Sequence, residues 1–123
     1  AVLALWRHAD AEPTHPDDAE GLRTLLDRDP EALIVAVDGD RLVGSVIVGW
    51  DGWRGAIYRL VVAPGHRRRG LGGRLLRAAE QRLDGARARR AHAIVVETDP
   101  QATAFWRASG WVEQVERLRF VRG

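Results

Sequence analysis

The chain has 123 residues and a formal net charge of +2, values that fit one globular domain, over residues 1–123, with a core of its own. It contains no cysteine, which excludes disulfides, a thiol nucleophile and a cysteine zinc site. No apolar run approaches the roughly 18 residues of a membrane span and no signal-peptide pattern opens the chain, so we expect a cytoplasmic protein without membrane contact.

Two helices are predicted first. A helix over residues 1–9 places four apolar side chains on one face, namely Val2, Leu5, Trp6 and Ala9. The polar segment 9–17 holds two prolines and is predicted as a loop. The carboxylates at positions 17 and 18 favour a helix start, and this second helix ends near Pro30. Its apolar stripe consists of Leu22, Leu25 and Leu26.

Three strands follow in a pattern typical of an antiparallel meander. They are predicted over residues 32–37, 41–50 and 56–63. A tight turn at 38–40 joins the first pair, and a second turn at 51–55 joins the next.

The remaining chain predicts helix, strand, helix and strand. Leucines and alanine at four-residue spacing indicate a helix from residue 71 to its end at Gly85. A strand at 93–97 is expected to lie parallel to strand 56–63 through this crossover helix. A short helix at 100–109 stops at Gly110, and a last strand is expected over 111–121.

A basic, glycine-rich turn joins strand 56–63 to the following helix. Its sequence is Arg67-Arg68-Arg69-Gly70-Leu71-Gly72-Gly73. Backbone N–H groups of such a turn converge, and the helix dipole adds positive potential, so the segment is predicted to bind phosphate. A P-loop is excluded because the chain has no lysine, and the dinucleotide fingerprint lacks its third glycine.

Two segments carry a resemblance to the GNAT superfamily of N-acetyltransferases. Residues 60–64 and 67–72 match its acetyl-CoA-binding pattern, a strand L-x-V-x-P followed by [QR]-x-x-G-x-[GA]. Residues 102–111 are similar to the family's A-x-x-[FL]-Y-x-x-x-G-[FW] segment. The resemblance covers nearly the whole chain. Residues 48–55 are also similar to a turn of a bacterial subgroup often labelled YpeA-like.

The resemblance implies an α/β (α+β) GNAT fold. Its mixed, mostly antiparallel sheet has a central parallel strand pair, splayed to admit coenzyme A and flanked by helices. The family's fold usually begins with a strand before the first helix, and no strand pattern precedes residue 2, so we expect that first strand to be missing from this chain.

The resemblance also implies an acetyl-CoA-dependent N-acetyltransferase. Backbone of Leu60, Val61 and Val62 would contact pantetheine, with an N–H near Val61 facing the thioester oxygen. The pyrophosphate would be held by the backbone of residues 67–73, and the side chains of Arg67, Arg68 and Arg69 would add attraction. This segment supplies most of the cofactor-site residues: Arg67, Arg68, Arg69, Gly70, Leu71, Gly72 and Gly73.

The acid and the base are not settled by the sequence. Trp106 stands where the family's tyrosine acid is expected, and because indole N–H does not ionise usefully, Trp106 is interpreted as a packing aromatic in the cofactor wall. Tyr58 could replace the acid, or none is needed, since a thiol with a pKa near about 8.5 leaves readily. Glu97 could act as base through water, or be a surface residue. Asp51 is a further candidate for the base, or a turn residue whose side chain hydrogen-bonds its own loop.

The resemblance implies that the acceptor is a small-molecule or peptide amine, whose identity the sequence does not give. Trp50, Asp51, Trp53 and Arg59 are candidate acceptor-binding residues, although the aromatic members could equally cover the core. Four histidines lack metal-ligand spacing, so no metal is expected. The arginine clusters are short, which disfavours nucleic-acid binding. A CoA-binding protein without catalysis remains the alternative, and a homodimer is compatible with the resemblance.

Overall fold

The computed structural model describes residues 1–9, 18–67, 69–95 and 99–122. The chain divides into two compact units, Ala1–Ala93 and Ile94–Gly123, and each is described by itself. No helix in the described parts of the chain is long and apolar enough to cross a bilayer.

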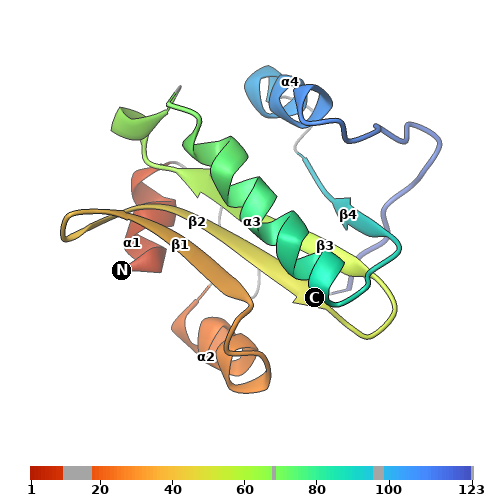
Figure 1. Cartoon of the computed structure of the whole chain (residues 1–123), viewed down its shortest axis with the longest axis horizontal. Coiled ribbons are helices and arrows are strands. Elements are labelled where there is room, and N and C mark those ends of the chain that lie inside the picture. The colour runs from red at the N-terminus through yellow and green to blue at the C-terminus, as the bar shows by residue number, and fades with distance from the viewer. Residues whose placement is uncertain (10–17, 68, 96–98, 123) are drawn as a thin grey trace. The chain divides into compact units, whose positions relative to one another are not determined.

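The first unit is built on a four-stranded mixed sheet (Figure 1). Its strands, in chain order and in spatial order, are β1 (Leu33–Asp38), β2 (Arg41–Trp50), β3 (Gly55–Val62) and β4 (Ala91–Ala93). The first three pair antiparallel and β4 pairs parallel with β3. The predicted meander and the parallel pair are confirmed.

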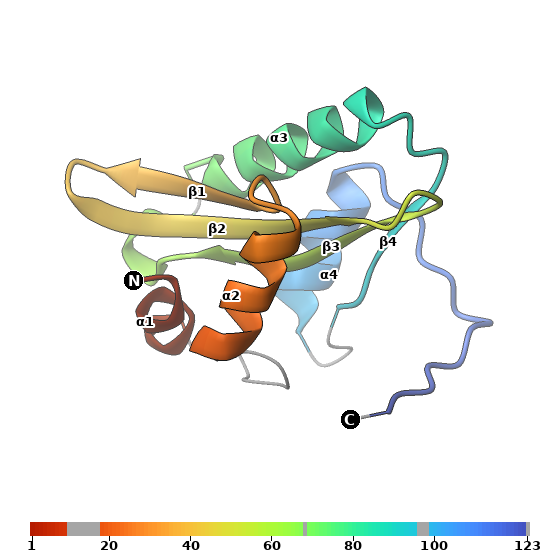
Figure 2. The ribbon, with the colours of Figure 1, turned by 90° about the horizontal axis from the view of Figure 1, so that it is seen from below.

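Helices cover both faces of this sheet. Figure 2 shows α3 (Leu71–Gly85) on one face, with α1 (Val2–His8) and α2 (Ala19–Arg28) on the other. Asp18 caps α2, because its carboxylate accepts a hydrogen bond from the Gly21 N–H at 2.7 Å. The predicted helices are confirmed, whereas most of the predicted loop at 9–17 lies outside the described residues.

Alternation along β2 builds a core on each face. Val43 and Ile47 pack with Leu5 and Trp6 of α1, and β2 is buried over residues 43–48. On the other face, Gly44 leaves room for the helix: a Cβ there would lie 2.9 Å from Leu75 Cδ1 of α3. Because both faces are covered, β2 has a nearly continuous apolar sequence.

The strand after the crossover differs from the prediction. Pairing of β3 with β4 comprises three residue pairs and ends at Ile57 and Ala93. The described part of the predicted strand 93–97 is therefore wrong in position, because β4 begins two residues earlier and Ile94 and Val95 are not strand residues. The physical reason is an irregularity in β3 between Tyr58 and Val61, where two residues of β3 face one residue of β2, so β4 finds a regular ladder only before this point. Positions 96 and 97 lie outside the described residues.

The second unit contains α4 (Pro100–Ala108). The Asp99 carboxylate caps it by accepting from the Ala102 N–H, and Gly110 follows with φ +87°, so this helix and its stop are confirmed. The predicted strand at 111–121 is wrong. Its side chains make local contacts, such as Arg107 with Glu113 and Arg117 with Gln114. Three of its aliphatic residues recur every three positions rather than every two, unlike a one-sided strand; these are Val112, Val115 and Leu118.

Candidate functional site

A β-bulge interrupts β3 where its pairing with β4 has ended. Ser45 is opposite Val61 and Ile47 is opposite Tyr58, so one residue of β2 faces two residues of β3. Arg59, the first of those two, has φ +50°, in the left-handed region. A side chain there costs roughly 1–2 kcal/mol relative to ordinary backbone. The bulge is therefore a strained feature that its surroundings must hold.

Two buried side chains hold it. The Ser45 hydroxyl donates to the Arg59 carbonyl oxygen at 3.0 Å and accepts from Trp6 Nε1 at 2.9 Å. Ser45 is 0% exposed and Trp6 only 4%. The Arg59 guanidinium lies over the Trp6 ring, with Cζ 5.4 Å from the ring centroid. Sequence reasoning missed Trp6 and Ser45 as part of the site, although a lone serine inside the apolar run of β2 was a usable signal.

The turn after β3 is anchored by two side chains. A 3₁₀ turn (Pro64–His66) begins it, and His66 Nε2 lies 3.0 Å from the Asp38 carboxylate at the end of β1. Arg67 donates from Nε to the Val62 carbonyl at 3.2 Å and from a terminal nitrogen to the Ala9 carbonyl at 3.3 Å. The Arg67 side chain thus ties the turn to β3 and to the end of α1.

The turn ends at the N-terminus of α3. Gly70 precedes the helix with φ +74°, and the first intrahelical hydrogen bond runs from the Arg74 N–H to the Gly70 carbonyl. N–H groups at 71–73 therefore have no partner within the helix. The first turn of α3 contains no acidic residue, and Arg69 beside it is exposed. This end of α3 suits an anion. Arg68 lies outside the described residues.

Tyr58 lies at the other side of the bulge. It is 50% exposed, and its ring packs across Gly49, where a Cβ would lie 3.2 Å from Tyr58 Cε2. The following residues of β3, Leu60 to Val62, are partly buried. Beyond Ile57, no described residue is registered against β3 on the β4 side. The chain thus runs from β3 with its bulge directly into the glycine-rich turn before α3.

The candidate acceptor residues of the β2–β3 turn lie at the opposite end of β3. Asp51 Oδ1 accepts from the N–H groups of Trp53 and Arg54, each at 2.7 Å. These bonds, the one from Arg54 foremost, hold the pKa of the Asp51 carboxyl below its usual value and make it a poor base. Trp53 is 72% exposed, and the Arg54 guanidinium lies 4.3 Å from its ring centroid.

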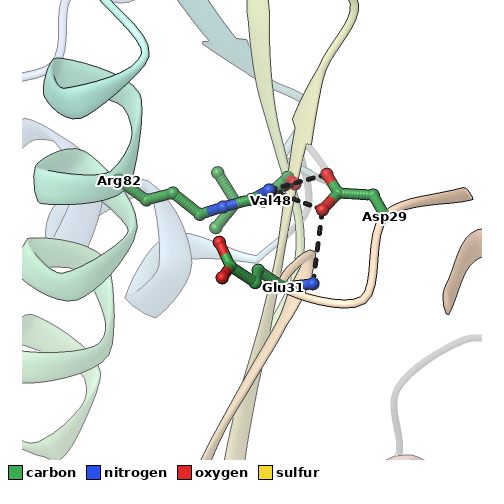
Figure 3. A network of polar contacts seen from close by, with 4 residues as sticks. All are labelled: Asp29, Glu31, Val48 and Arg82. Atoms are coloured by element: carbon green, nitrogen blue, oxygen red, sulfur yellow. Dashed lines mark hydrogen bonds and ion pairs between the residues drawn. The ribbon is translucent and has the colours of Figure 1, made fainter.

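A cavity of about 370 Å³ lies at the same end of the sheet, and Trp50 is one of its lining residues. Figure 3 shows the polar network at its wall: Arg82 donates to the Val48 carbonyl at 2.9 Å and to both Asp29 oxygens at 2.6 and 2.7 Å. The hydrogen bond from Arg82 lowers the pKa of Asp29. The Arg82 charge is therefore already paired.

In the second unit, Trp106 belongs to an aromatic cluster. Its ring meets Phe105 edge-on with centroids 5.8 Å apart and Trp111 with centroids 4.9 Å apart. The described contacts of Trp106 are thus with other aromatic rings of the same unit, and its place in the cofactor wall stays a prediction. Glu97 lies outside the described residues. Among the residues that are described, no group of three His, Cys, Asp or Glu side chains could hold a metal ion.

Comparison with known proteins places this arrangement in a family. A family model described as "Acetyltransferase (GNAT) family" matches residues 2–111. An acetyltransferase of Yersinia pestis is 38% identical over 82 residues, which are 67% of this chain and 58% of that protein. An acetyltransferase of Pectobacterium atrosepticum is 34% identical over 97 residues, 79% of this chain and 69% of that protein.

Solved structures agree at the level of the fold. Ard1 from Thermoplasma volcanium has a TM-score of 0.79 at 19% identity, with 93% of this chain and 78% of that one covered. AAC(6')-Iy, in complex with the bisubstrate analogue CoA-S-monomethyl-acetylneamine, has a TM-score of 0.72 at 21% identity, with 98% and 90% covered. The chain therefore belongs to the GNAT acetyltransferase family. It spans less than two thirds of the length of the Yersinia relative.

Proposed function

We propose that the protein is an acetyl-CoA-dependent N-acetyltransferase that moves an acetyl group to a primary amine of a small molecule or peptide. The observation that carries this proposal is the continuity of a bulged strand with an anion-binding helix N-terminus. The bulge in β3 frees backbone after its pairing with β4 ends, and the N–H groups at 71–73 begin eleven residues after Leu60. One extended ligand with a phosphate end and an amide-containing arm fits such a sequence of donors.

Each part of the proposed site has its own task. The N–H groups at 71–73 and the exposed Arg69 bind the pyrophosphate. The backbone of Leu60, Val61 and Val62 pairs with the pantetheine amides, as an added strand would. The Arg67 side chain already bonds two carbonyls, so it shapes the turn, while its backbone remains part of the phosphate site.

The reaction is direct transfer. The deprotonated amine attacks the thioester carbonyl, a tetrahedral oxyanion forms against backbone N–H groups of β3, and CoA leaves as a thiolate. Glu97 accepts the amine proton through water, and Tyr58 donates a proton to the leaving sulfur. Trp106 is assigned to the cofactor site on the resemblance of residues 102–111 to the family's segment. Acceptor binding involves Arg59 at the bulge, while Trp50, Asp51 and Trp53 lie at the far end of β3.

A second candidate is a CoA-binding protein without catalysis. It is favoured by Trp106, which replaces the tyrosine expected at that position and cannot donate a proton usefully. The two candidates share the cofactor site, so binding does not separate them. Turnover does.

The test begins with calorimetric titration of acetyl-CoA into the native protein, Gly72→Glu and Gly72→Gln. A carboxylate in the first turn of α3 favours the helix but repels phosphate, so Gly72→Glu stays folded and loses binding at least about tenfold. Gly72→Gln is the matched neutral control and retains most of the affinity. An amine panel followed by release of free CoA thiol then separates enzyme from binder. A folded native protein that does not bind acetyl-CoA overturns both candidates.

A further inference from the structure

We infer that Ser45 and Trp6 are positioning residues that set the direction of the Leu60 N–H, the backbone N–H next to Val61 that would face the acetyl-CoA thioester oxygen. This inference rests on the proposed function and assigns a role to two buried side chains outside the sequence motifs. Its basis is the chain of hydrogen bonds that runs from Trp6 through Ser45 to the Arg59 carbonyl.

The direction of that chain is fixed by chemistry. An indole N–H can only donate, so the Ser45 oxygen must be the acceptor at 2.9 Å from Trp6 Nε1. The single hydroxyl proton of Ser45 is then free to go to the Arg59 carbonyl oxygen, 3.0 Å away. With Ser45 fully buried, water does not compete for either bond. The Arg59 carbonyl therefore has one fixed orientation, toward β2.

Peptide planarity transmits this orientation to the next residue. The Arg59 carbonyl and the Leu60 N–H belong to one planar trans peptide, in which they point in opposite directions. A carbonyl held toward Ser45 turns the Leu60 N–H away from it. On that side β3 has no registered partner among the described residues beyond Ile57. The Leu60 N–H is thus presented where an extended ligand would pair with β3.

The backbone conformation shows why such a restraint is needed. Arg59 has φ +50°, where a glycine would be unstrained and an arginine is not. Without Ser45 the strained peptide can rotate to relieve φ, and the Leu60 N–H rotates with it. Arg59 and Trp6 are thus linked twice: their side chains are in contact, and Ser45 connects the Trp6 indole to the Arg59 carbonyl.

The test compares two ligands on native protein and Ser45→Ala. Acetyl-CoA uses both the strand and the phosphate turn, whereas adenosine 3′-phosphate 5′-diphosphate, the nucleotide end of CoA, uses the turn alone. We expect Ser45→Ala to raise the Kd for acetyl-CoA about tenfold, as loss of one oriented hydrogen bond does, and to change the Kd for the nucleotide less than about twofold. Equal changes for both ligands, or none for either, overturn the inference.

Val48→Ala is the matched control for lost stability. Val48 is also 0% exposed and also on β2, but it faces Ile57, before the bulge. It should leave the ratio of the two Kd values as in the native protein. A changed ratio in Val48→Ala would attribute the Ser45 effect to general loosening and overturn the inference.

Arg59→Gly provides a second arm, which also removes the contact of the Arg59 guanidinium with the Trp6 ring. Glycine relieves the left-handed strain, so in an Arg59→Gly background the Ser45→Ala change should alter the Kd ratio less than in the native background. An equal effect in both backgrounds overturns the inference. If the native protein binds both the nucleotide and acetyl-CoA, and the variants have native Kd values, only the role of Ser45 is refuted. A native protein that binds neither removes the proposed function itself.

Discussion

Arg82 on α3 and Asp29 at the end of α2 form a two-point ion pair that joins helices on opposite faces of the sheet. The guanidinium nitrogen lies 2.6 and 2.7 Å from the two carboxylate oxygens, and the same side chain donates to the Val48 carbonyl of β2. Both side chains are about three-quarters buried, at 22% and 25% exposure. The pair fixes the C-terminal half of α3, whose other end is the proposed phosphate site.

Replacing this carboxylate should therefore lower stability in a pH-dependent way. The Arg82 hydrogen bond holds the pKa of Asp29 below its unfolded value of about 3.9. The stabilisation is thus complete above that value and is lost as the pH falls through the lower folded pKa. Asp29→Asn should reduce the free energy of unfolding by about 1–2 kcal/mol at pH 7, and this difference should shrink below about pH 4.

Urea denaturation at pH 7 and at pH 3 measures both quantities. Asp27→Asn is the matched control, because it removes the same charge from an exposed position of the same helix. If native protein and Asp29→Asn differ in free energy of unfolding by the same amount at both pH values, the ion pair between Asp29 and Arg82 is not the cause of the difference.

The two arginines on either side of position 68, Arg67 and Arg69, should behave differently. Arg67 bonds the Val62 and Ala9 carbonyls, so Arg67→Ala should lower the free energy of unfolding by about 1 kcal/mol. Arg69 is exposed beside the helix N-terminus, so Arg69→Ala should leave stability unchanged and weaken acetyl-CoA binding about fivefold.

Salt provides the control for this pair. Attraction between Arg69 and phosphate is screened by dissolved ions. The difference in acetyl-CoA affinity between the native protein and Arg69→Ala should therefore become smaller as the salt concentration rises from about 0.05 to about 0.5 M. An Arg67→Ala variant with native stability, or a salt-independent Arg69 effect, would be inconsistent with these roles.

Much of the fold follows from periodicity in the sequence. Helices and meander strands are confirmed because each has one dominant pattern, such as the leucine stripe of α3 or the apolar run of β2. The predictions of strands after residue 90 were wrong because the positions of these strands depend on pairing with another strand and not on the local sequence pattern. β4 is set by its register with Gly55–Ile57, and the segment after Gly110 has no strand partner among the described residues.

The candidate site was predictable where a motif defines it. Glycines and arginines before α3 indicated the phosphate turn. The bulge was not predictable, because Arg59 is a residue type that rarely takes a positive φ. Its supports, Trp6 and Ser45, are 39 residues apart and meet only through tertiary packing.

Asp51 should prove structural rather than catalytic. Its carboxylate accepts two backbone N–H groups of its own turn, and the amide oxygen of asparagine can accept the same bonds. Asp51→Asn should therefore leave kcat within about twofold, whereas loss of a general base costs about 100-fold or more. Steady-state release of CoA thiol measures this. A large fall in kcat for Asp51→Asn with native acetyl-CoA affinity would reassign Asp51 as the base.

The proposed function assigns the remaining proton transfers to Tyr58 and Glu97, and conservative variants of the two residues test these assignments separately. Tyr58→Phe keeps the ring that packs across Gly49 but removes the hydroxyl, so acetyl-CoA affinity should be unchanged while kcat falls about tenfold. The fall is small because a thiolate leaves without much help. Glu97→Gln should lower kcat by about 100-fold or more at neutral pH, and the loss should narrow at high pH, where the acceptor amine is already deprotonated.

Unchanged kcat in Tyr58→Phe would mean that the thiolate leaves unassisted, whereas unchanged kcat in Glu97→Gln would mean that solvent takes the amine proton. Because the two residues act on opposite partners of the transfer, the double variant should lose the product of the two single effects, provided that chemistry limits the rate. A double variant no slower than Glu97→Gln would place both side chains in a single proton-transfer step.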